Sequence, residues 1–315
     1  MDEYFLEIEA RSGFIARGEV LAAGLDDRFI RCQLQTRRWT RIRKGAYLFT
    51  SSWDELGPEE RHRRLARAVL HSHGDRVVLS KVSGLLMHPG IDCWDIDLNR
   101  VHVTRRDGRA GSVERDVIHH EGPMADEDIV EIDGLLVSSE SRCAVETIAL
   151  APLEAGLVVA DSVLHRGRVD FDRLWEELAR MQRWRGSRRA DVVLRLADGR
   201  SESVGESRSR YVFWSQGLPK PDLQVKIRDA GGSLVGIVDL GWLAHRTLYE
   251  FDGRVKYGRL VKPGQQPSDV LFAEKRREDA IREATGCTIV RATWADLSQP
   301  RELAMRVRAR MRDSA

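Results

Sequence analysis

The chain lacks the features of a membrane protein and of a disulfide-stabilised protein. No apolar run approaches the roughly 18 residues that cross a bilayer, and the N-terminus MDEYFLEIEARSG is acidic where a signal peptide is basic and then apolar. The cysteines are far apart, with no CxxC pair and no Cys/His spacing that suits zinc. We expect a cytoplasmic protein without membrane contacts. Its reduced core thiols would be Cys32, Cys93, Cys143 and Cys287.

The length and composition indicate a globular protein with more than one domain. The chain has 315 residues, of which 42% are hydrophobic and 32% are charged, so two or three cores are expected and disorder is not. We predict an α/β (α+β) protein. Its expected parts are a winged helix-turn-helix (1–52), an α/β middle domain (53–168), a helical connector (169–200) and a C-terminal α/β domain (201–315).

Acidic residues are absent from one basic segment near the N-terminus, although the net charge of the chain is only +2. The segment 28–44 contains seven basic residues and no acid. They are Arg28, Arg31, Arg37, Arg38, Arg41, Arg43 and Lys44. A dense block of cations is what a polyphosphate backbone attracts.

The segment before and within this block predicts a helix-turn-helix. Helices are expected at 2–11 and 17–23, and Gly24 suits a left-handed C-cap after the second helix. Either Asp26 or Asp27 can cap a third helix through about residue 36. On that helix the apolar side chains share one side, and a polar stripe spans an arc of roughly 60° on the other. The candidate base-reading residues of this stripe are Arg28, Arg31 and Gln35.

A β-hairpin follows the third helix and predicts the wing. Residues 39–42 alternate as a strand, Lys44-Gly45 turns, and residues 46–49 return. We expect Trp39 and Tyr47 to be core anchors, and basic side chains at the tip or outer face to contact phosphates. The candidate phosphate contacts are Arg41, Arg43 and Lys44, and Arg38 is a further candidate DNA-binding residue.

The segment GFIARGEVLAAGLDDRFIRCQLQTRRWTRIRKGAYLF resembles the N-terminal winged helix of AbiEi-type antitoxins from bacterial abortive-infection systems. The resemblance continues more weakly to about residue 165. In that family the winged helix binds DNA upstream of its own operon and represses it. The resemblance implies double-stranded DNA as a partner and a cognate toxin as a second one. The alternative is that this winged helix is a protein-interaction module.

The middle region predicts mixed helices and strands without a recognisable site. Its histidines scatter over several elements and lack the short spacings of metal-ligand sets, so we expect no metal site there. These histidines are His62, His71, His73, His102, His119 and His120. We expect a structural or oligomerisation domain, consistent with a homodimer. In the connector, arginines around Trp184 favour either a solvated helix face or a nucleic-acid contact.

From residue 201 the pattern changes to a helix, three strands, a helix and a strand. Asp239 lies on the strand 234–240, and Glu250 and Asp252 share one face of the strand 247–252 by the two-residue period. We expect these acids to converge at adjacent strand ends, with Glu206 from the preceding helix completing a ligand shell. Like charges this close require a cation, and hard oxygen ligands select Mg²⁺ or Mn²⁺, which could activate water against a phosphodiester.

Residues 200–300 resemble very-short-patch-repair endonucleases, a branch of the PD-(D/E)XK superfamily with a restriction-endonuclease-like fold. The matching segments are GES, VDLGW, YEFDG, EKRRED and IVRATWADL. The resemblance implies that Asp239 and Glu250 are metal-binding acids.

The sequence departs from that family at one catalytic position. The family's lysine, two residues after the second acid, is Asp252 here, so Lys256 or Lys275 would have to stabilise the transition state. Two functions therefore stay open. One is a metal-dependent DNA endonuclease in phage defence, toxin–antitoxin or mobile-element biology. The other is a non-catalytic antitoxin or repressor that autoregulates its operon.

Overall fold

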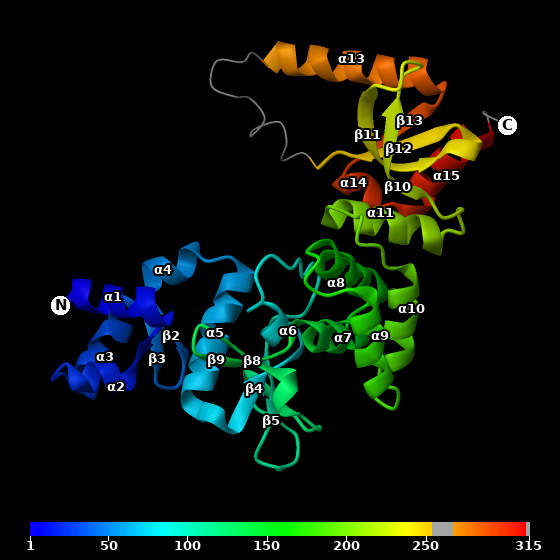
Figure 1. Cartoon of the computed structure of the whole chain (residues 1–315). Helices are drawn as coiled ribbons and strands as arrows, with labels where there is room; N and C mark the ends of the chain where they lie inside the picture. The colour runs from blue at the N-terminus through cyan, green and yellow to red at the C-terminus, as the bar shows by residue number, and fades with distance from the viewer. Residues whose placement is uncertain (254–266, 313–315) are drawn as a thin grey trace. The chain divides into compact units, whose positions relative to one another are not determined.

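The computed structural model describes the backbone of residues 1–253 and 267–312 and has the expected mixed α/β fold (Figure 1). The described residues divide into two compact units. The first unit combines residues 1–151 with 169–191, and the second combines 152–168 with the described residues from 192 onward. Each unit is considered by itself below.

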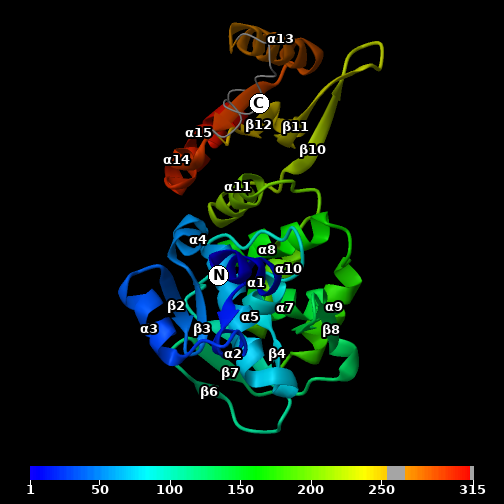
Figure 2. The same ribbon diagram turned by 90° about the vertical axis from the view of Figure 1, so that its left-hand side faces the viewer.

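The N-terminal part of the first unit is a helix-turn-helix with a β-hairpin wing (Figure 2). Its three strands are ordered β1-β3-β2. Gly24 has φ +79° at the turn, and the Asp26 carboxylate caps α3 by accepting the Phe29 N–H at 2.9 Å. The elements are α1 (Asp2–Ser12), β1 (Ile15–Ala16), α2 (Arg17–Ala22), α3 (Asp27–Gln35), β2 (Trp39–Arg43) and β3 (Ala46–Phe49).

Aromatic side chains form the core of this module. Trp39 is only 3% exposed and stacks on Tyr47, with ring centroids 6.0 Å apart. Its ring also meets Phe5, Phe29 and Phe49 edge-on, at centroid distances of 5.2, 5.6 and 6.0 Å. The prediction that Trp39 and Tyr47 are core anchors is therefore confirmed.

A mixed six-stranded sheet, ordered β6-β7-β5-β4-β9-β8, follows in the first unit. Helix α5 packs on one face of it, where its apolar side chains join the buried valines of the central strands. Helix α5 ends at His73. The elements are α4 (Thr50–Glu55), α5 (Pro58–His73), η1 (Gly74–Arg76), β4 (Val77–Leu79), α6 (Lys81–Leu85), β5 (Val101–Arg105), β6 (Ser112–Val113), β7 (Val117–His120), η2 (Asp126–Asp128), β8 (Ile129–Ile132) and β9 (Leu135–Ser138).

Two helices complete the first unit, α7 (Glu140–Leu150) and α9 (Phe171–Arg180). Ser139 precedes α7, but its hydroxyl makes no capping hydrogen bond. Trp184 is half-buried, with the guanidinium of Arg142 and the ammonium of Lys81 5.7 and 5.9 Å from its ring centroid. Trp184 therefore packs within the first unit, against cations at the start of α6 and on α7.

The division of the chain differs from the expected one around residue 152. Helix α8 (Leu153–His165) belongs to the second unit, where it packs on α11 (Val204–Ser215). Two ion pairs fix this contact, Arg210 with the buried Asp161 and Arg208 with Glu154 at 2.7 Å. The expected connector is divided between the units, because α9 packs on α7 while α10 (Ser187–Leu196) crosses the boundary.

The second unit is built on a four-stranded sheet ordered β10-β11-β12-β13. The pairs are antiparallel except β12–β13, which is parallel, with α13 between the two strands in the chain. Tyr249 and Phe251 enter the core shared with α11 and α15. The remaining elements are β10 (Asp222–Arg228), β11 (Leu234–Trp242), η3 (Leu243–His245), β12 (Thr247–Phe251), α13 (Pro267–Thr285), β13 (Thr288–Ala292), α14 (Trp294–Leu297) and α15 (Pro300–Arg312).

The cysteines match the prediction except for one. Cys93, Cys143 and Cys287 are buried, whereas Cys32 is exposed because it lies on the polar side of α3, one residue after Arg31. No helix among the described residues is long and apolar enough to span a bilayer.

Candidate functional site

The outer face of α3 carries the predicted base-reading residues. Arg28, Arg31 and Gln35 are all exposed, whereas Ile30 on the opposite side is 3% exposed and packs in the aromatic core. Among the residues that the structure describes, no carboxylate lies within ion-pair distance of Arg28 or Arg31. The face therefore presents two guanidiniums and an amide to solvent.

The acid at the start of α3 is neutralised locally. Arg17 donates to both carboxylate oxygens of Asp27, from Nε at 2.8 Å and from Nη2 at 2.7 Å. These hydrogen bonds hold the pKa of Asp27 below its usual range. Arg17 is thus the direct partner of Asp27, and Arg31 contributes only a smaller electrostatic effect on the pKa of that carboxylate.

The wing presents some of its predicted phosphate contacts. Arg41 and Lys44 are exposed, and within the described part of the chain no acid pairs with either of them. Arg38 is exposed as well, but its guanidinium pairs with Asp2 of α1. Gly45, at φ +79°, makes the turn of the hairpin.

Arg43 lies elsewhere than predicted. Its side chain is only 12% exposed, and its guanidinium pairs with Asp116 at 3.1 Å and with Glu114 at 3.3 Å. Both acids belong to the turn between β6 and β7. Arg43 therefore anchors the wing to the middle sheet and does not lie on the outer face.

Glu250 of the second unit is neutralised by arginines. The parallel pairing of β12 and β13 sets Glu250 beside Arg291, whose Nε lies 3.3 Å from Oε2. Arg277 of α13 donates to the other oxygen, Oε1. The side chain of Glu250 is 12% exposed, so both oxygens are held inside the protein by guanidinium groups.

The carboxylate of Glu206 makes hydrogen bonds to groups at the start of α11 and on β10. It accepts hydrogen bonds from the Ser203 hydroxyl at 2.8 Å, the Glu202 N–H at 3.0 Å and the Gln224 amide at 3.0 Å. Asp239 is half-buried, and its Oδ2 accepts the Phe251 N–H at 2.7 Å. These hydrogen bonds give Glu206 a structural role at the start of α11 and Asp239 a structural role beside β12.

The predicted convergence of acids is therefore not found. Within the described ranges, no three-ligand group forms from Glu206, Asp239, Glu250 and Asp252. The Asp252 N–H donates to the Ala292 carbonyl at 2.7 Å and continues the β12–β13 pairing. Lys256 lies outside the described residues. As arranged, this donor set does not fit Mg²⁺ or Mn²⁺.

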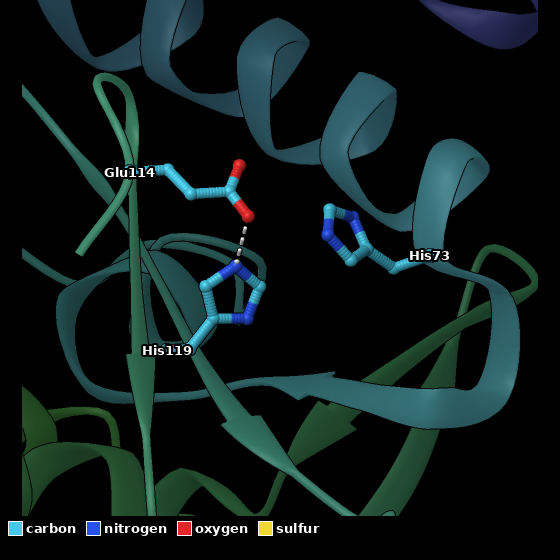
Figure 3. A group of neighbouring side chains, drawn as sticks. All are labelled: His73, Glu114 and His119. Atoms are coloured by element: carbon cyan, nitrogen blue, oxygen red, sulfur yellow. Dashed lines mark hydrogen bonds and ion pairs between the residues drawn. The ribbon is translucent and has the colours of Figure 1, made fainter. Parts of the chain in front are cut away.

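A different cluster forms in the middle sheet, where no metal site was expected. His73 at the end of α5, Glu114 after β6 and His119 on β7 place ligand atoms within 4.8 Å of one another (Figure 3). The Nε2 of His119 lies 3.0 Å from Glu114 Oε1. The expectation that the histidines scatter was therefore wrong for His73 and His119, which lie together in this cluster. The detectable pattern was the alternation Val117/His119, which directs His119 to the face that α5 covers.

Comparison with known proteins gives relatives without a described activity. Two curated Mycobacterium tuberculosis proteins, "Uncharacterized protein MT2308" (strain CDC 1551 / Oshkosh) and "Uncharacterized protein Rv2248" (strain ATCC 25618 / H37Rv), are each 30% identical over 186 residues. The match covers 57% of this chain and 65% of each relative, so the chain spans less than two thirds of their length. No family model matches the chain.

Proposed function

We propose that the protein binds duplex DNA through α3 and the wing and acts as a non-cleaving regulator of the repressor type. The observation that carries the proposal is the solvent-facing stripe of Arg28, Arg31 and Gln35 on the second helix of a helix-turn-helix. The likeness of this segment to AbiEi-type antitoxins supports the same role.

The chemistry of the stripe suits the major groove. An α-helix fits that groove, where arginine pairs with guanine O6 and N7 and glutamine pairs with adenine N6 and N7. Arg41 and Lys44 on the exposed side of the wing suit the flanking phosphates. The proposal assigns sequence preference to α3 and general affinity to the wing.

The second unit is assigned no cleavage step. Glu250 is paired with two arginines, and Glu206 accepts three hydrogen bonds from neighbouring groups. Replacing these partners by an ion would leave Arg277 and Arg291 without their shared carboxylate. This arrangement favours a scaffold in which the acids hold strands and helices together.

The test selects duplexes from a random pool with the full chain and measures binding by fluorescence anisotropy at several salt concentrations. Arg28→Ala with Arg31→Ala should weaken binding at least about tenfold and relax the selected sequence, since one base contact is worth ~1–3 kcal/mol. Arg41→Ala and Lys44→Ala should each lower the salt slope by about 1. Arg11→Ala, an exposed arginine of α1, is the matched control.

Two results would contradict the proposal. Unchanged affinity and unchanged salt slope in all these variants would remove α3 and the wing from the DNA. Nicking of plasmid DNA in Mn²⁺ that is lost in Glu250→Ala would show that the second unit cleaves DNA.

A further inference from the structure

We infer that His73, Glu114 and His119 form a binding site for a divalent transition-metal ion of the Zn²⁺ class (Figure 3). The site lies where the end of α5 meets the β6–β7 hairpin. It is separate from the acids of the second unit and from the stripe on α3.

His73 is already oriented as a metal ligand. Its Nδ1 lies 2.9 Å from the Val69 carbonyl oxygen and 3.1 Å from the Ser72 hydroxyl. A proton on Nδ1 donated to that carbonyl leaves Nε2 unprotonated, and Figure 3 shows this edge of the ring turned toward Glu114 and His119. Metal-bound histidines are usually fixed in this way, through a hydrogen bond from the second ring nitrogen to a backbone carbonyl.

His119 is the buried member of the cluster. It is 4% exposed, its ring centroid lies 5.1 Å from that of His73, and its Nε2 faces Glu114 Oε1 at 3.0 Å. Its Nδ1 is buried and finds no hydrogen-bond partner among the described residues. The nitrogen within reach of the Glu114 carboxylate is therefore Nε2, which is the candidate ligand atom of this ring.

The spacing of the ligand atoms is close to what a tetrahedral ion needs. Zn²⁺ bonds of about 2.0–2.2 Å place tetrahedral ligands roughly 3.3–3.6 Å apart. The three ligand atoms lie within 4.8 Å of one another, and two of them are already 3.0 Å apart. Small side-chain movements would therefore close the site without moving a strand.

The ligand types select the metal. Two imidazoles with one carboxylate form a known three-residue zinc set, which leaves the fourth position to water. Imidazole suits zinc, cobalt, nickel and copper, whereas Mg²⁺ and Ca²⁺ prefer oxygen ligands. Glu114 keeps its second oxygen for Arg43 of the wing, at 3.3 Å. A bound ion would therefore tie α5 to the hairpin that anchors the wing.

The test uses the full chain after treatment with EDTA and dialysis. Zn²⁺ binding is measured by calorimetry, and Co²⁺ binding by visible absorption, which reports coordination directly. We expect one equivalent to bind, and at about 100 times the Kd the Tm should rise by roughly 5 °C. His73→Gln should weaken binding at least tenfold. His71→Gln, two residues away on the same helix and exposed, should leave it unchanged.

Two further variants guard against misfolding and indirect effects. Glu114→Gln keeps the shape of the side chain and a group that can bond His119, so it should lose Zn²⁺ affinity while its Tm in EDTA stays close to that of the wild type. Asp116→Asn removes the other partner of Arg43 without removing a ligand, so it should bind Zn²⁺ normally.

The proposal is overturned if no saturable binding near one equivalent is found. It is also overturned if His71→Gln weakens binding as much as His73→Gln does, because the ion would then be held by surface histidines in general. Since neither readout involves DNA, failure here leaves the DNA-binding proposal untouched.

Discussion

Charged side chains are left unpaired in one region of the molecule and are paired with one another in a second region. The outer face of α3 exposes Arg28 and Arg31, with no carboxylate of the described chain within ion-pair distance of either. The sheet of the second unit encloses Glu250 between Arg277 and Arg291. An exposed cation without a partner can accept a phosphate or a base, whereas a carboxylate held by two guanidiniums has already made its strong interactions.

The difference arises from local arrangement and not from composition. On α3, the acid at the first position, Asp27, is paired with Arg17. In the second unit, the register of a parallel strand pair sets Arg291 beside Glu250. A cluster of charged residues in the sequence therefore predicts a binding site only where the fold leaves the charges unpaired.

The largest expected effect concerns the core that supports the α3 face. Trp39→Ala should destabilise the winged-helix module by ~3–5 kcal/mol, because it removes a buried ring that contacts four aromatic neighbours. Limited proteolysis should then cut within residues 1–52. Trp214→Ala, which truncates a ring that is 44% exposed, is the control and should cost much less. A well-folded Trp39→Ala variant with weaker DNA binding would place Trp39 on the DNA instead.

The next prediction tests whether the charge of Glu250 stabilises or destabilises the second unit. Glu250→Ala should lower the stability of the second unit by about 1–3 kcal/mol, because it leaves two arginines without their shared partner. The figure allows for solvent screening, since both arginines are about one third exposed. Urea unfolding measures the change, with exposed Glu283→Ala on α13 as the control. If repulsion between Glu250 and Asp239 dominated, the same substitution would stabilise the unit.

The sequence predicted α3 and the wing well because their determinants are local. Gly24, the Asp26 cap and the apolar spacing lie within a few residues of the elements they define. The faces of β12 were also predictable from the two-residue period, which directs Tyr249 and Phe251 into the core.

The pairings between distant elements were not predictable. The His73–Glu114–His119 cluster joins α5, β7 and the turn that follows β6, a strand of only two residues. Arg43 finds its acids 71 and 73 residues later in the chain. Helix α8 is apolar on nearly all sides, so its sequence does not tell which unit it joins. Such partners depend on tertiary register, which no local pattern encodes.

A smaller effect is expected from a second histidine pair, which faces the other side of the middle sheet. His102 Nδ1 lies 2.9 Å from His120 Nε2. Burial, with the nearby charge of Lys81, lowers their pKa values to about 4 and about 3. The unfolded chain therefore binds more protons below pH 6.5, and stability should fall as the pH drops from 7 toward 4.

Between pH 7 and pH 5 this loss should be about 1–2 kcal/mol, after allowing for partial exposure of both rings. Urea unfolding at several pH values, in EDTA, measures the slope for the full chain. His120→Gln should make the slope shallower, whereas exposed His71→Gln should not. An unchanged slope in His120→Gln would contradict this assignment, because the pH dependence of the free energy of unfolding would then come from other groups.

The smallest expected effect concerns Arg38, a candidate DNA contact that forms an ion pair with an exposed acid of the winged-helix module. Its partner is Asp2, and the two side chains are 53% and 52% exposed. Because exposed ion pairs contribute ~0–1 kcal/mol, Asp2→Asn should free Arg38 and strengthen DNA binding by less than about fivefold at low salt. The gain should shrink as salt screens it. Glu3→Gln removes the same charge one residue away, so an equal gain in both variants would assign the effect to net charge and not to Arg38.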